Sequence, residues 1–139
     1  MCAGIALAQE VIVSDAWTRA TAPGQAVAGV YFDIESENNA RLVGVETGVT
    51  DLAELHFMKM EDGVMRMRSL PKVDLPERET VKFAPGGLHV MLFELKRPLE
   101  AGSEFGLTLL VEDDGGRRTP VNVNVEVRNF DGSRAHHHH

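Results

Sequence analysis

The sequence predicts an all-β fold, an antiparallel sandwich or Greek-key barrel of about eight or nine strands. Short segments rich in Val, Phe and Leu recur along the chain, and many of them alternate apolar with polar residues. Clusters of Gly, Pro, Asn and Asp separate nearly all of these segments. No segment shows an apolar stripe at helical spacing over three turns. Eight or nine strands in about 120 residues is the strand density of a sandwich or barrel.

The first four expected strands each carry an alternating or near-alternating apolar pattern. Pro23-Gly24 supplies a turn between the first and second, and the polar run 36–39 supplies one between the second and third. We therefore expect strands at 11–16, 26–34, 41–47 and 53–60.

The remaining five expected strands are also bounded by turn residues. Asp62-Gly63 precedes the fifth strand, Pro85-Gly86-Gly87 the seventh, and Asp113 to Gly116 the last. We expect these strands at 64–70, 80–83, 88–95, 105–112 and 121–127. Neither an internal repeat nor a second-domain boundary interrupts the pattern.

The size and charge of the chain restrict its class. It has 139 residues and a formal net charge of −7, with 43% hydrophobic and 25% charged residues, which is typical of one folded domain. The acidic balance argues against nucleic acid as a partner. No apolar run approaches the roughly 20 residues that a transmembrane helix needs. We expect a monomer without a transmembrane segment.

Cysteine chemistry is excluded by number. Cys2 is the only cysteine, so the chain has no disulfide framework, no CxxC motif and no site built from several thiolates. Residues 1–9 resemble the remnant of a secretory signal, with Ala6-Leu7-Ala8 as a small-x-small cleavage site. The fate of Cys2 stays open.

The other end of the chain, 129–139, resembles a linker followed by a His tag, and we expect the β-sandwich domain to occupy 10–128. Without the tag, the histidine count falls from 6 to 2. The two that remain are His56 and His89.

Segment 54–69 predicts a hairpin. Asp62-Gly63 between two alternating runs is among the strongest signals for a two-residue turn of type I′. That turn sets Met58 opposite Met67, with His56 diagonal to Met67 at roughly 5–8 Å between β-carbons. Because side chains alternate along a strand, one face of the hairpin collects a histidine and four methionines. These residues are His56, Met58, Met60, Met65 and Met67.

A second strand carries the remaining histidine and methionine. His89 and Met91, at i and i+2, share one face of their strand. Apart from Met1, every methionine of the chain lies in the hairpin or on this strand. Thioether and imidazole ligands without carboxylate or thiolate suit Cu(I) better than Zn²⁺, Ca²⁺ or Mg²⁺. The two segments together predict a Cu(I) site.

The spacing of four of these residues resembles a known signature. His56, Met67, His89 and Met91 form H-x10-M-x21-H-x-M, the metal-binding pattern of the periplasmic copper chaperone family called PCuAC. The stretches 15–24 and 28–32 are also similar to the opening strands of that family. The resemblance extends from Glu10 to about Val127.

The resemblance implies a cupredoxin-like fold that carries one Cu(I) per chain at an exposed edge. The implied metal ligands are His56, Met67, His89 and Met91. It further implies export to the periplasm and delivery of copper to the CuA site of a cytochrome oxidase subunit, alongside a thiol-bearing assembly factor.

The roles of several neighbouring residues stay open. Met58, Met60 and Met65 could shield the ion, replace a ligand during transfer, or pack against neighbours. We expect Trp17 to anchor the core. We expect Lys59, Arg66 and Arg68 to form a solvated face.

Three rival functions need to be distinguished. A copper oxidase or electron-transfer protein would need a cysteine or a site with several histidines, so we expect no enzyme. A structural sandwich would use the methionines as core, and replacing them would cost stability alone. A copper storage protein would share the site and lack the delivery.

Overall fold

The computed structural model describes residues 10–134, and all the regular elements in that range are β-strands. Two expected features, the signal remnant at 1–9 and the histidine run at 136–139, lie outside the described residues. The ten strands are β1 Val11–Arg19, β2 Ala28–Ser36, β3 Ala40–Thr47, β4 Leu52–Glu61, β5 Val64–Leu70, β6 Val73–Leu75, β7 Thr80–Phe83, β8 Leu88–Phe93, β9 Glu104–Asp113 and β10 Arg118–Arg128.

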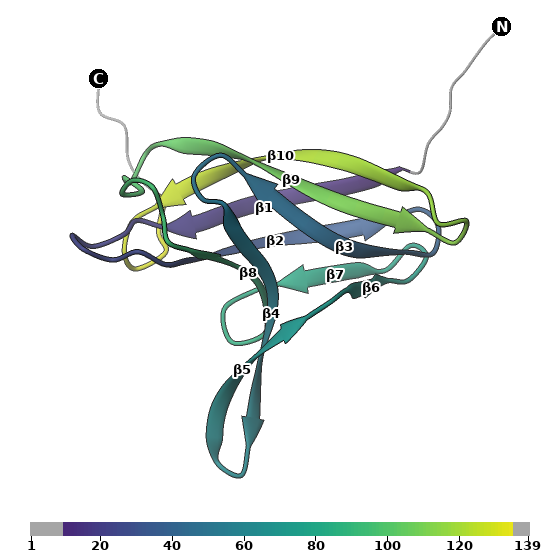
Figure 1. Ribbon diagram of the computed structural model, residues 1–139, viewed down its shortest axis with the longest axis horizontal. Coiled ribbons are helices and arrows are strands. Elements are labelled where there is room, and N and C mark those ends of the chain that lie inside the picture. The colour runs from purple at the N-terminus through teal and green to yellow at the C-terminus, as the bar shows by residue number, and fades with distance from the viewer. Residues whose placement is uncertain (1–9, 135–139) are drawn as a thin grey trace, which may run out of the picture.

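The strands form one sheet that curls into a nearly closed barrel (Figure 1). Their order is β5-β4-β8-β7-β2-β1-β10-β9-β3-β6, and β8 also pairs with β2. Strands β3 and β4 contact each other across the opening. The predicted all-β class is confirmed, and no helix able to cross a bilayer occurs within residues 10–134.

Two features of the topology differ from the expectation. The structure has ten strands instead of eight or nine, because β6, a three-residue strand, pairs with β3 through Ala40–Leu75 and Leu42–Val73. The sheet is also not wholly antiparallel. Strand β1 pairs with β10 in parallel, with Trp17 opposite Glu126, and β7 meets β8 in parallel.

Strand β2 shows how the sequence builds the core. Its residues alternate strictly between buried and half-buried positions, as expected of a strand with one face on the interior. Val30, Phe32 and Ile34 point inward and are essentially inaccessible. Leu42 of β3 and Leu109 of β9 are equally buried in the same cluster. The outward face of β2 is therefore free to carry other side chains.

The β4–β5 hairpin has the predicted turn and register. Asp62 and Gly63 have φ values of 52° and 79°, which is the type I′ conformation. Met58 pairs with Met67 and Met60 with Met65. In Figure 1 the hairpin extends away from the rest of the barrel, and β5 is the outermost strand of the sheet.

Trp17 does not anchor the core, contrary to the expectation. Its half-buried ring lies 4.9 Å from the ring of Tyr31. The guanidinium groups of Arg19 and Arg128 lie 5.2 Å and 4.8 Å from its centroid, in the range of cation–π contacts. The side chain emerges on the outer face because Trp17 pairs with outward-facing Tyr31.

Candidate metal centre

The two non-tag histidines lie directly opposite each other on adjacent strands. His56 of β4 pairs with His89 of β8, and their ring centroids are 5.8 Å apart at an interplanar angle of 47°. Both side chains are buried, with exposed fractions of 8% and 5%. Two imidazoles separated by 35 positions in sequence (89 − 56 is 33, plus the two themselves) are thus neighbours in one sheltered place.

His56 is oriented by a carboxylate. Its Nε2 lies 2.8 Å from Oε1 of Glu54, and because a carboxylate only accepts, Nε2 is the donor. The other ring nitrogen, Nδ1, is buried and lacks a hydrogen-bond partner in the described part of the chain. An unpaired buried nitrogen costs free energy unless a ligand occupies it. The lone pair of Nδ1 therefore fits a metal ion.

Sequence analysis missed Glu54. The signal was its position, two residues before His56 on the same strand, which places both side chains on one face. Carboxylates that hold the second nitrogen of a ligating histidine are common around metal sites.

His89 is oriented from its other nitrogen. Its Nδ1 donates to the carbonyl oxygen of Gly87 at 3.0 Å, which leaves the lone pair on Nε2. Burial lowers the pKa of His89 below its ordinary value; the bond to Gly87 opposes that shift and nearby His56 adds to it. A lowered pKa keeps the imidazole neutral, the form that binds metal.

The predicted methionine ligands flank the histidines on two diagonals. Met67 of β5 pairs with Met58, one pair along from His56, and Met91 of β8 pairs with Glu54, one pair along in the other direction. Diagonal neighbours in a sheet are about 7–8 Å apart at the backbone, which long side chains can close. Methionine has the flexible, unbranched chain that this requires.

The remaining hairpin methionines differ in their distance from the histidines. Met58 is half-buried, and its place opposite Met67 makes it diagonal to His89 as well. Met60 and Met65 lie further along the hairpin, with exposed fractions of 60% and 49%. Exposure of this size is inconsistent with the alternative in which these two methionines fill the core.

The expectation of an exposed edge site holds for one part of this face. Met67 is 42% exposed, whereas His56 and His89 are buried. The histidine pair is therefore sheltered and the Met67 side is open to solvent. A ligand from another molecule would approach from the hairpin side.

The face continues across the sheet as a row of aromatic rings. The ring of Tyr31 on β2 lies 6.5 Å from that of His89, and Trp17 on β1 follows Tyr31. On the other side, the ring of Phe93 lies 5.6 Å from that of His56. These apolar surfaces limit the access of water to the histidines.

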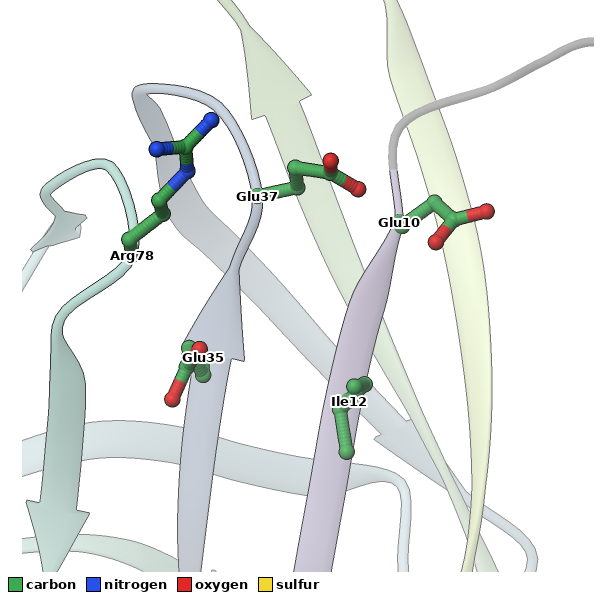
Figure 2. A pocket seen from close by; sticks show the side chains of 5 residues that line it. All are labelled: Glu10, Ile12, Glu35, Glu37 and Arg78. Atoms are coloured by element: carbon green, nitrogen blue, oxygen red, sulfur yellow. The ribbon is translucent and has the colours of Figure 1, made fainter.

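Alternative sites are weak by comparison. Within residues 10–134, no three His, Cys, Asp or Glu side chains lie close enough to hold a metal ion, so a site without methionine is not built there. A surface hollow near the start of β1 is lined by Glu10, Glu35, Glu37, Ile12 and Arg78 (Figure 2). It includes none of the four predicted ligands.

Comparison with known sequences identifies the family. The sequence model described as "Putative lipoprotein LpqE-like" matches residues 11–127. The chain belongs to the LpqE-like family. A putative lipoprotein of Leifsonia xyli subsp. xyli is 33% identical to this LpqE-like chain over 129 residues, which is 91% of the chain and 74% of the relative. An uncharacterized protein of Rickettsia prowazekii is 32% identical over 108 residues, 73% of the chain, and the match spans only 56% of that protein.

Solved structures share the fold of this LpqE-like chain. The apo PmoF2 PCuAC domain has a TM-score of 0.68 and 24% identity over 90% of the chain and 94% of the domain. The solution structure of CuI-DR1885 from Deinococcus radiodurans has a TM-score of 0.61 and 28% identity over 86% of the chain and 76% of that structure. The predicted resemblance to PCuAC proteins is confirmed, as is the all-β, cupredoxin-like fold that it implied.

Proposed function

We propose that this chain is a copper chaperone that binds one Cu(I) through His56, Met67, His89 and Met91. The observation that carries the proposal is the buried histidine pair, 5.8 Å between ring centroids, with a methionine on a neighbouring strand along each diagonal of His56. Each histidine has one nitrogen held by a protein oxygen and the other nitrogen unpaired by those contacts.

The donor set favours Cu(I). Two neutral imidazoles and two thioethers contain no anionic ligand, so they stabilise hard divalent cations poorly. Thioethers also bind copper without forming disulfides under oxidising conditions. The relative CuI-DR1885, 28% identical, carries the same ion in its name.

We propose that the protein acts outside the cytoplasm, in the periplasm. The family is described as putative lipoproteins, and so is the Leifsonia relative, which supports export. The absence of any need for a thiolate suits this location.

We propose delivery to the CuA site of a cytochrome oxidase subunit, alongside a thiol-bearing assembly factor, and no enzymatic activity. Exposure of Met67 supports delivery, because ligands exchange stepwise where one of them is open to solvent. Met58 is the accessory methionine we favour for shielding, since it is half-buried opposite Met67.

The experiment is a Cu(I) competition titration under reductant, with a chromophoric chelator and protein without the histidine tag. We expect one tight equivalent for the parent chain, and its loss in the His89→Ala/Met91→Ala double variant. Absence of tight binding by the parent chain would remove the copper function.

Storage is the second candidate, since it needs the same ligands and no acceptor. A transfer assay separates the two functions. Mixing the Cu(I)-loaded chain with a soluble CuA domain should move copper on a timescale faster than passive dissociation into a chelator. Transfer no faster than that dissociation would favour storage.

A further inference from the structure

Strand β5, Val64–Leu70, is an unprotected sheet edge beside the candidate metal centre. It stands at the end of the strand order, and β4 is its only neighbour among the described strands. Six of its seven residues are exposed. A long exposed edge strand is a template for pairing with another chain, and proteins normally shorten or cover it.

The free backbone groups of this edge belong to Met65, Met67 and Ser69. Hydrogen bonding alternates along an antiparallel pair, and the type I′ turn bonds Glu61 to Val64. The N–H of Met58 donates to Gly87 at 3.1 Å, on the side away from β5, which gives the same alternation. Met67, opposite Met58, therefore turns its N–H and C=O outward.

The two faces of this edge differ in chemistry. Met65 and Met67 lie on the face of His56, and the alternate residues Arg66 and Arg68 lie on the other face. Both arginines are 57% exposed and pair with Glu61, the charge on which Lys59 also converges. Three cations against one carboxylate leave this face positive in a chain whose net charge is −7.

We propose that β5 docks an extended segment of the copper acceptor as an added antiparallel strand. The segment carries a sulfur ligand opposite Met67 and an acidic residue on each side of it. Residues paired in register project to the same face, so the sulfur lies on the histidine face while its acidic neighbours face Arg66 and Arg68. Recognition by strand addition uses main-chain bonds for affinity and alternate side chains for specificity.

This docking would make copper transfer a local ligand exchange, and it rests on the proposed function. A bond forms between Cu(I) and the sulfur of the acceptor as the bond between Cu(I) and the Met67 sulfur breaks. Copper stays Cu(I) throughout. If the acceptor ligand is a thiol, its proton passes to solvent.

The test uses the full chain without copper and a fluorescein-labelled peptide, TVECEVT, under reductant. Met65→Pro removes an outward N–H without breaking a bond to β4, and Met65→Ala is its control, because both lose the thioether and only proline loses the N–H. We expect Met65→Pro to weaken peptide binding about tenfold relative to Met65→Ala. Peptide-induced amide shifts should centre on Val64 to Arg68.

Further arms separate the outcomes. The peptide TVKCKVT should bind more weakly than TVECEVT, with a difference that shrinks at high salt. Equal binding of TVECEVT by both Met65 variants would overturn strand addition. Self-association that Met65→Pro abolishes would identify the occupant as a second copy and also overturn the proposal. Cu(I) titration of the same variants tests the proposed function separately, because peptide docking is measured without copper.

Discussion

The carboxylate of Glu54 does for His56 what the carbonyl of Gly87 does for His89. Each oxygen accepts one ring N–H and leaves the other nitrogen with its lone pair. The two histidines thereby use different nitrogens, Nδ1 and Nε2. Ligands whose orientation is fixed before metal arrives lose less conformational freedom on binding.

Removal of Glu54 should weaken copper binding. We expect Glu54→Ala to lower Cu(I) affinity about 10- to 100-fold, the usual effect of losing such a partner. Glu54→Gln should lose less, because its amide oxygen still accepts from Nε2 of His56. Chelator competition gives the affinities, and ¹⁵N NMR of the imidazole in the apoprotein reports which nitrogen holds the proton. An unchanged proton position in Glu54→Ala would contradict the orienting role.

Acid should destabilise the apoprotein through His89. Its pKa is lowered in the folded chain, chiefly by burial, so the unfolded chain binds more protons as the pH falls below about 6.5. The free energy of unfolding should decrease from that pH down to the folded-state pKa. Urea unfolding at pH 7.5 and 5.5 measures it, and His89→Gln should show a smaller difference between the two pH values.

The hairpin is the element on which the position of Met67 depends. Gly63 has a φ of 79°, with nothing within 4 Å of an added β-carbon, so alanine there meets strain and no clash. We expect Gly63→Ala to cost about 1–2 kcal/mol, seen as faster amide exchange in β4 and β5. Gly106→Ala, which also has open space and lacks a positive φ, is the control and should leave hairpin exchange unchanged.

Most elements could be predicted from the sequence because their signals are local. Alternation and turn residues located nine strands, and Asp62-Gly63 gave the hairpin register residue by residue. Strand β6 was missed because three residues are too few for a periodic pattern, and Val73 and Leu75 become a strand only by pairing with β3. Glu54 was missed because its partner was not sought two residues away.

Whole-molecule stability and copper binding should respond to different substitutions. Leu109 is fully buried, so Leu109→Ala should cost about 2–5 kcal/mol. Met67 is 42% exposed, so Met67→Ala should cost less than about 1 kcal/mol. Thermal unfolding of the apoproteins measures the first difference. Cu(I) affinity at 25 °C should show the opposite order, and a large stability loss in Met67→Ala would favour the structural alternative.

Closure of the barrel could not be predicted from local pattern. Strand β1 and strand β10 lie at opposite ends of the domain sequence, yet Trp17 pairs with Glu126 and Thr18 with Val127. Nothing in either segment specifies a parallel partner. The same closure brings Arg128 over Trp17, and this contact explains why a residue expected in the core lies on the outer face.

The exposure of the hairpin methionines also makes them targets for peroxide. Oxidation to the sulfoxide adds a polar oxygen and converts a soft sulfur donor into a hard one. Met67 is open to this reaction at 42% exposure, while the histidines beneath it are sheltered. An oxidised chain would stay folded and lose its copper, and a methionine sulfoxide reductase would restore it. Oxidative stress would therefore reach copper supply through the same open side that lets copper leave.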